Sequence, residues 1–204
     1  MDLLLPPGHD LPDWAAPLDY GRPVVATADE VPNELYHGSR ALVSKSALDV
    51  FARSPAHYLH YLQSGLTDDE VPESEALLPG SAFHSLVLEP EDFARRYVKL
   101  PDFGTMQSSK NRALRDSWLE QRPGTIGLKL NQWQMIHAMR ESVYRHKRLR
   151  RILENGRPEV TCAVVCPHTG LPRKVRVDWV SEIDGIGIDM KSALDGSPDV
   201  WKRE

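Results

Sequence analysis

The chain has 204 residues, of which 41% are hydrophobic and 26% are charged, a composition typical of a globular protein with one sizeable core. No apolar run approaches the ~18 residues of a membrane span, and residues 3–5 are too short a run for a signal peptide, which indicates a cytoplasmic protein with no membrane partner. A formal charge of −4 argues against a protein that coats nucleic acids nonspecifically.

Residues 1–36 are expected to form a proline-rich arm or linker. Proline removes a backbone donor and interrupts regular elements, and the apolar residues of this stretch show little periodicity, so no helix or strand fits it. The prolines are Pro6, Pro7, Pro12, Pro17, Pro23 and Pro32. The remainder, residues 37–204, is expected to be one domain.

A pair of helices is predicted after the arm. Ser44 can cap the first helix, which is expected to turn Leu48, Phe51 and Ala52 inward. Ser54-Pro55 ends or breaks that helix, because the residue before a proline disfavours the helical conformation. A second helix is therefore predicted to begin at this point.

The middle of the chain alternates between loops and helices. Residues 64–79 are predicted to be a loop, and Gly80 opens a helix that Glu89-Pro90 closes. The apolar stripe of this helix is Phe83, Leu86 and Val87. Residues 99–127 are predicted to be mostly loop, with one short helix around residues 113–120.

The longest amphipathic helix is predicted over residues 130–153, where apolar residues recur at three- and four-residue steps. Those residues are Leu130, Trp133, Ile136, Met139 and Val143. A dense basic run overlaps the end of this helix, and it consists of Arg140, Arg145, Lys147, Arg148, Arg150 and Arg151. Such a run is either a local site for a polyanion or a solvated helix face.

Three apolar runs after Gly156 predict a three-strand sheet. The runs are rich in valine and isoleucine and cover residues 159–166, 172–181 and 186–191. Asp184-Gly185 favours a two-residue hairpin turn between the last two strands. Thr169-Gly170 is the matching candidate between the first two.

The register that follows from these turns brings charged side chains together. With a two-residue turn at 184–185, Asp178 lies directly opposite Lys191, and the alternation of side chains places Asp189 on the same face. A two-residue turn at 169–170 pairs Glu159 with Val180 and adds Glu159 to this face. A three-residue loop would put Glu159 on the other face.

Carboxylates packed this closely favour a divalent cation between them, and all-oxygen donors favour Mg²⁺ or Mn²⁺ over zinc. A lysine beside such a cation can lower the pKa of a bound water and stabilise charge that grows on a phosphate, which is the chemistry of phosphodiester hydrolysis. The alternative is a surface sheet whose exposed face carries aspartate, glutamate and lysine without a function.

Cys162, Cys166 and His168 raise a second metal possibility. Structural zinc usually takes four ligands and pairs cysteines across a turn, whereas these two cysteines lie in an expected strand. Their separation along the strand is too long for a disulfide, so both thiols are expected to be reduced.

The order Glu159, Asp178, Asp189-Met190-Lys191 resembles the PD-(D/E)xK nucleases, an α+β class with a restriction-endonuclease-like core of mixed sheet and helices. More specific similarity lies upstream, where three segments resemble the RecE exonuclease VIII pattern, as does Thr169-Gly170-Leu171. These segments are residues 44–48 (Ser-Lys-Ser-Ala-Leu), 54–58 (Ser-Pro-Ala-His-Tyr) and 80–90, which begins Gly-Ser-Ala-Phe-His. The resemblance covers about residues 37–202.

The resemblance implies an active site residue by residue. His84 occupies the position of the family's helical histidine at the metal site, and three carboxylates correspond to those that serve the metals. The expected metal ligands are His84, Glu159, Asp178, Asp189 and the Met190 carbonyl, with Lys191 as the lysine that activates the water. Phosphate contacts are expected from Lys45, Arg173 and Arg176.

The implied activity is that of a Mg²⁺- or Mn²⁺-dependent exodeoxyribonuclease that digests linear double-stranded DNA from 5′ to 3′ in phage-type recombination. The implied partners are double-stranded DNA ends, a RecT-like single-strand annealing protein and further copies of the chain in a ring-shaped homo-oligomer. Two other interpretations stay open. One is another PD-(D/E)xK nuclease, such as a RecB-like or phage-λ-like exonuclease or an endonuclease, and the other is a non-catalytic DNA-binding or assembly remnant.

Two features differ from the patterns of related families. Some relatives hold an iron–sulfur cluster through four cysteines, and with two cysteines no cluster is expected here. Only 13 residues follow Lys191, whereas the RecE family continues with a helix bearing Gln-x-x-x-Tyr and a fourth strand. The domain is therefore expected to be incomplete at its C-terminus, and weakly active or inactive as an exonuclease by itself.

Overall fold

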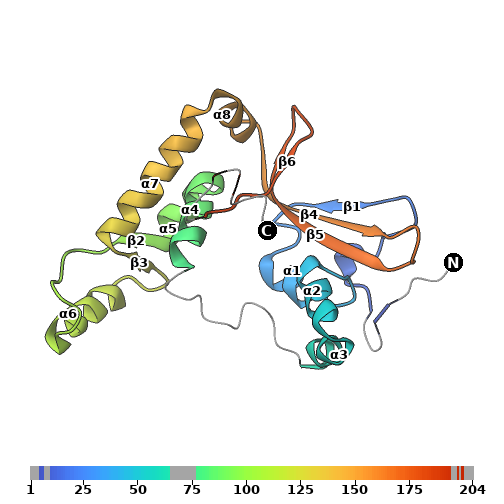
Figure 1. The fold of residues 1–204 in the computed structure, drawn as a ribbon, viewed down its shortest axis with the longest axis horizontal. Coiled ribbons are helices and arrows are strands. Elements are labelled where there is room, and N and C mark those ends of the chain that lie inside the picture. Colours follow the sequence, from blue (N-terminus) through green and yellow to red (C-terminus); the bar gives the residue numbers. More distant parts are fainter. Residues whose placement is uncertain (1–4, 7–9, 65–76, 194–196, 198, 200–204) are drawn as a thin grey trace. The chain divides into compact units, whose positions relative to one another are not determined.

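A computed structural model describes residues 5–6, 10–64, 77–193, 197 and 199. Its backbone contacts divide the chain into two compact units, of which the first joins residues 1–72 to Gly156–Asp189 and the second joins residues 73–155 to residues 190–204. Helices and strands occur in both units (Figure 1), which confirms the expected α+β class. No described helix is long and apolar enough to cross a membrane.

The first unit is built on a four-stranded antiparallel sheet in the order β1-β4-β5-β6 (Figure 1). β4 (Gly156–Val165) and β5 (Pro172–Ser181) form a long hairpin, as their valine-rich runs predict. β6 (Gly187–Ile188) pairs with β5, and β1 (Val24–Ala26) pairs with the other edge of β4. The predicted meander is therefore present, with one more strand beside it.

β1 lies where the sequence predicts no regular element. Val25 pairs with Cys162, so a three-residue strand is stabilised by a partner more than a hundred residues away, which local periodicity does not reveal. Two short helices, η1 (Asp13–Ala15) and α1 (Asn33–Gly38), flank it. The core that this N-terminal segment forms with β4 contains Ala15, Leu18, Ala41, Leu42, Ala163 and Val165.

The β4–β5 and β5–β6 connections are four-residue loops, not the predicted two-residue turns. Cys166 N–H donates to the carbonyl of Leu171 at 2.9 Å, which closes the first loop over residues 167–170, and Ser181 N–H donates to Ile186 at 2.8 Å around residues 182–185. The last residue of each loop is a glycine at positive φ, 73° at Gly170 and 60° at Gly185. Each glycine supplies a left-handed residue at the end of a longer loop, a conformation that other residues rarely adopt.

The longer loops move each strand pairing by two residues. In the observed register Val180 pairs with Arg157 of β4, not with Glu159, and it pairs with Gly187 of β6 on its other side. The predicted pairs Glu159–Val180 and Asp178–Lys191 are therefore wrong. Because side chains alternate with a period of two, a shift of two residues leaves every side chain on its predicted face.

Two helices precede the second unit. Ser44 caps α2 (Lys45–Arg53) by accepting a hydrogen bond from Ala47 N–H at 3.2 Å, and Ser54 caps α3 (Pro55–Gln63), so the predicted break is confirmed. The prediction that Leu48 and Phe51 turn inward is wrong, since each is about half exposed and Ala47 is the buried residue of α2. Periodicity indicated the helix but not the side that packs.

In the second unit, helix α4 packs against α5 and α7 (Figure 1). α4 (Leu78–Leu88) begins two residues before the predicted Gly80 and buries the predicted stripe of Phe83, Leu86 and Val87. Pro90 does not simply end it, because proline also fits the first turn of the next helix, α5 (Pro90–Arg96). The predicted loop at 64–79 lies mostly outside the described residues.

Two short strands and a helix fill the region predicted to be mostly loop. β2 (Tyr97–Lys99) and β3 (Ile126–Leu128) pair in parallel, and α6 (Ser109–Glu120) starts four residues before its expected position. The predicted helix over residues 130–153 is two helices, α7 (Leu130–Arg145) and α8 (Lys147–Leu153). The ring nitrogen of His146 accepts from Leu149 N–H at 3.3 Å and caps α8, which separates the two.

Candidate active site

Two carboxylates meet on one face of the β4–β5 hairpin. Pro158 pairs with Trp179 and Val160 with Val177, so the intervening Glu159 lies opposite Asp178. A carboxylate oxygen of Glu159 lies within 4.8 Å of one of Asp178, and both residues are half-buried. The predicted register is wrong, and in the observed register these two acids are direct cross-strand neighbours.

Glu159 is the only described residue other than glycine with positive φ, at 51°. This conformation is uncommon for a residue with a Cβ and typically costs on the order of 1–3 kcal/mol. The pairs on either side keep the same register, so the irregularity inserts no extra residue into β4. The strain is therefore confined to the residue that presents the carboxylate.

The neighbouring positions of β5 on the same face carry two cations, Lys174 and Arg176, which form hydrogen bonds within the protein. Lys174 is buried and donates to the carbonyl oxygens of Ser39, at 2.8 Å, and Tyr36. Arg176 donates to Thr161 Oγ1 at 2.9 and 3.0 Å and to Asn33. These bonds tie the end of α1 to β5.

Tyr36 lies between the two cations. Lys174 Nζ is 4.5 Å from the centre of its ring and Arg176 Cζ is 4.3 Å from it, distances that allow cation–π attraction. Burial raises the pKa of the Tyr36 hydroxyl, while the charge of Arg176 opposes the shift and the charge of Glu159 adds to it. Glu159 therefore shares its electrostatic environment with this cluster, of which only Arg176 was an expected site residue.

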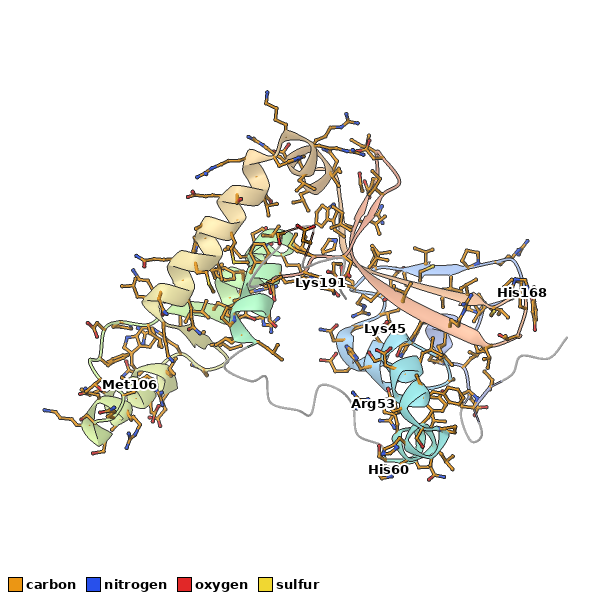
Figure 2. All side chains as sticks on the ribbon, in the orientation of Figure 1. Lys45, Arg53, His60, Met106, His168 and Lys191 are labelled. Carbon is orange, nitrogen blue, oxygen red and sulfur yellow. The ribbon has the colours of Figure 1, made fainter. Side chains whose placement is uncertain are left out.

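The remaining predicted site residues lie at several places in the fold. Asp189 directly follows β6 in the first unit and is exposed, and a continuation of the β5–β6 register would place it opposite Asp178. His84 is half-buried on α4, and Met190 and Lys191 follow Asp189; these three belong to the second unit. Lys45 is exposed at the start of α2 (Figure 2) and pairs with Asp49 at 2.6 Å.

The predicted phosphate contacts at Arg173 and Arg176 have different surroundings. Arg173 is exposed on β5, whereas the guanidinium of Arg176 is occupied by the hydrogen bonds to Thr161 and Asn33. The sequence signal for a charged face was the alternation of side chains that places Asp178, Asp189 and Lys191 on one side of the sheet. It could not show which of the charges are bound within the protein.

The donor set of the carboxylate pair fits a hard divalent cation. Mg²⁺ binds oxygen at about 2.0–2.1 Å and Ca²⁺ at about 2.3–2.6 Å, so opposite ligands of one ion lie roughly 4–5 Å apart. The Glu159 and Asp178 carboxylate oxygens lie within 4.8 Å of one another, which is compatible with two ligands of one ion. Cys162 and Cys166 are free thiols and belong to no cluster of three or more metal-ligating side chains among the described residues.

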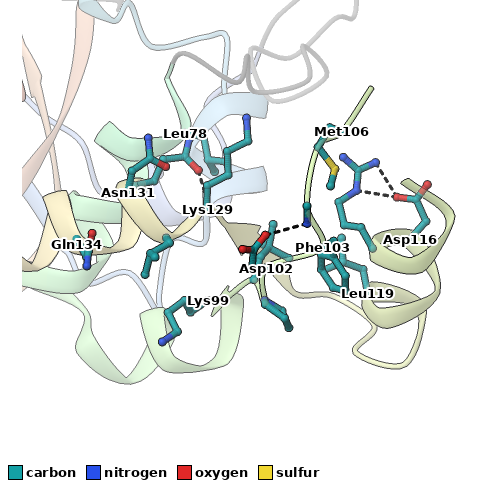
Figure 3. Close-up of a pocket in the computed structure, with 17 residues that line it drawn as sticks. Leu78, Lys99, Asp102, Phe103, Met106, Asp116, Leu119, Lys129, Asn131 and Gln134 are labelled. Carbon is teal, nitrogen blue, oxygen red and sulfur yellow. Dashed lines mark hydrogen bonds and ion pairs between the residues drawn. The ribbon is translucent and has the colours of Figure 1, made fainter. Parts of the chain in front are cut away.

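A separate cavity of about 800 Å³ lies within the second unit. Figure 3 shows Lys129 and Asn131 on one side of it and Met106 and Asp116 on the other. Its lining is mainly apolar and comes from the ends of β2 and β3, residues 100–106, α6 and the first turn of α7, with Leu78 of α4. None of the predicted catalytic residues lines it, so this cavity is distinct from the carboxylate pair.

Comparison with known families agrees with this geometry. The model of a family described as "PDDEXK-like domain of unknown function (DUF3799)" matches residues 44–204, a range that includes the carboxylate pair, Asp189, His84 and Lys191. No curated protein matches the chain. Nucleases with PDDEXK-like domains usually use divalent metals, in agreement with the oxygen donors on β4 and β5. The chain therefore belongs to the DUF3799 family of PDDEXK-like domains, within the PD-(D/E)xK nuclease superfamily.

Proposed function

We propose that this protein is a metal-dependent DNA nuclease that hydrolyses phosphodiester bonds at the ends of linear double-stranded DNA. The observation that carries the proposal is the Glu159–Asp178 pair, which places two half-buried carboxylates side by side in a chain of the PDDEXK-like family. Leaving like charges this close is unfavourable without a cation, so the pair favours a metal site over a passive surface.

The proposed roles follow from donor chemistry and from the resemblance to RecE. Glu159 and Asp178 would hold the ion, Asp189 would supply a third carboxylate, and His84 and the Met190 carbonyl would complete the ligand set. When bound, Mg²⁺ or Mn²⁺ would favour ionisation of a water and screen the charge of the phosphate. Lys191 would orient the attacking water and stabilise negative charge on the phosphate oxygens.

From the resemblance to RecE we further propose that the protein is a 5′-to-3′ exonuclease of phage-type recombination. It would form a ring-shaped homo-oligomer and act with a RecT-like single-strand annealing protein. An endonuclease of the same superfamily would cut closed circular DNA, and an exonuclease would not. Linear and closed circular duplexes of equal sequence separate the two.

The test compares hydrolysis of linear duplex DNA in Mg²⁺, Mn²⁺, Ca²⁺ and chelator by the purified chain and by the chain extended at its C-terminus with the helix and strand of the RecE family. For the extended chain we expect hydrolysis in Mg²⁺ and Mn²⁺, DNA binding without hydrolysis in Ca²⁺, and no hydrolysis in chelator; the 204-residue chain alone should be weakly active or inactive. Asp178→Asn should lower the rate by at least about 100-fold, because it removes one charged oxygen donor from the metal. Mn²⁺ affinity, measured by electron paramagnetic resonance, should fall in the same variant.

The matched control is Asp184→Asn, which makes the same chemical change at an exposed aspartate in the β5–β6 loop. It should keep the wild-type rate and Mn²⁺ affinity. Hydrolysis that persists in chelator, an unimpaired Asp178→Asn variant, or DNA binding by the extended chain without hydrolysis in any metal would each contradict the proposed function. The last outcome would favour a non-catalytic DNA-binding protein.

A further inference from the structure

A dense group of exposed basic residues lies on α8 and the last turn of α7. Residues 140–154 contain six lysine or arginine residues and two glutamates, a formal +4, whereas the whole chain carries −4. Five of these cations are exposed, and we call them the α8 basic surface: Arg145, Lys147, Arg148, Arg150 and Arg151. Arg140 is excluded, because its guanidinium lies 4.8 Å from the Tyr144 ring centre and its Nε is buried.

The fold separates these charges from the apolar side of α8. At 100° per residue, Leu149, Ile152 and Leu153 occupy one side of the helix and the four cations of α8 occupy the other. Ile152 and Leu153 are buried, so the apolar side is already used within the protein. The basic run of the sequence is therefore a continuous charged face and not an insertion surface for a membrane.

Only part of this charge is neutralised locally. Arg145 pairs with Glu141 at 3.3 Å and Arg150 pairs with Glu154 at 2.7 Å, both in exposed pairs that contribute little to stability. By contrast, Arg176 is held by Thr161 and Asn33, and Lys45 is paired with Asp49. Two of the three cations expected from sequence to contact phosphate, Lys45 and Arg176, are thus more engaged than Lys147 and Arg148.

We propose that the α8 basic surface binds the phosphate backbone of the DNA duplex and holds it by electrostatic attraction independent of sequence. This proposal rests on the proposed nuclease function, which identifies the polyanion as DNA. It goes further by naming α8 as the element that retains the DNA. Lysine and arginine that contact phosphates release counterions, so binding through this surface must weaken steeply with salt. An acidic lipid surface could also bind these cations, so the test has to distinguish lipid binding from DNA binding.

The test measures binding of a short labelled duplex by fluorescence anisotropy in chelator, where hydrolysis cannot occur. Lys147→Gln/Arg148→Gln should weaken binding and reduce the slope of log affinity against log salt by about 2, one for each lost phosphate contact. The control is Arg22→Gln/Arg53→Gln, which removes the same charge from exposed positions of the first unit (Arg53 is labelled in Figure 2). It should leave the slope unchanged, and circular dichroism should show both variants folded.

An unchanged slope in Lys147→Gln/Arg148→Gln, or an equal loss in the control, would overturn the proposal. Vesicles of phosphatidylcholine with phosphatidylserine form a parallel arm, and binding to them in preference to duplex DNA would also overturn it. Because the binding assay needs no metal, duplex binding through α8 combined with no hydrolysis in Mg²⁺ or Mn²⁺ in the nuclease test would contradict the proposed nuclease function alone.

Discussion

Glu159 combines an unusual backbone conformation with a proposed role as a metal ligand. Its φ of 51° is maintained because the adjacent Pro158–Trp179 and Val160–Val177 pairs hold the strand on both sides. Residues in such conformations often occur where the surrounding structure fixes a functional group. The carboxylate is thereby held opposite Asp178, at a cost to the stability of the metal-free protein.

Glu159→Gly tests this account when it is compared with Glu159→Gln. Both changes remove the charge beside Asp178, but only glycine relieves the positive φ, so Glu159→Gly should be more stable than Glu159→Gln by about 1 kcal/mol. Urea denaturation in chelator measures the difference, and both variants should bind Mn²⁺ less tightly than the wild type. A glycine variant that is no more stable than the glutamine variant would show that the backbone at this residue is not strained.

At the level of elements, the sequence indicated the central strands and the charged face but not their register. Alternation along β4 and β5 is a property of residue type, whereas loop length depends on whether Gly170 and Gly185 end a four-residue loop or form half of a two-residue turn. Each loop is two residues longer than the predicted turn, so every side chain stays on the face of the sheet that was predicted for it. The strain at Glu159 has no sequence signal, because backbone conformation there is imposed by the strands around it.

The helices show a similar limit. Capping residues such as Ser44 and Ser54 fixed where helices begin, since their hydroxyls accept from nearby backbone N–H groups. Which side of a helix is buried depends on distant partners, and Leu48 and Phe51 are consequently half exposed. Lys174 and Arg176 illustrate the same point, because their partners Ser39 and Asn33 are more than 130 residues away.

Gly156 lies where a side chain has no room. A Cβ at this position would be 2.3 Å from the carbonyl oxygen of Val180 and 2.5 Å from Trp179 Nε1. Gly156→Ala should therefore displace the start of β4 and lower the free energy of unfolding by about 1–3 kcal/mol. Gly38→Ala is the control, since a Cβ at Gly38 would meet nothing within 4 Å and its φ is not positive. Urea denaturation should show Gly38→Ala unchanged or stabilised by up to about 1 kcal/mol, and equal stabilities for the two variants would contradict the close approach.

In the whole chain, contacts group the N-terminal residues with the β4–β5 hairpin in one compact unit and the intervening helices in a second unit. The sequence could not indicate this grouping, because the β1–β4 pairing joins residues 24–26 to residues 161–163. Proline content reports local irregularity and not long-range pairing. The expected boundary between an arm and one domain at residue 36 stays a prediction.

The two units should differ in their ability to fold from one continuous segment. Residues 73–155 contain both partners of the α4–α5, α4–α7, α7–α8 and β2–β3 contacts, and their buried side chains include Phe83, Phe93 and Ile136. Residues 1–72 lack β4 and β5, so Val43 loses its backbone bonds to Pro172 and Lys174.

We therefore expect the isolated fragment 73–155 to fold and the isolated fragment 1–72 to remain largely unfolded. Buried apolar surface without its partner cannot offset the conformational entropy of ordering the chain. Circular dichroism and thermal melting of each fragment, beside the intact chain at the same concentration, measure the outcome. Fragment 73–155 should give a helical spectrum and a cooperative transition, and fragment 1–72 should give neither. Cooperative melting of fragment 1–72 alone would show that the N-terminal segment forms its own core and does not depend on the β4–β5 hairpin.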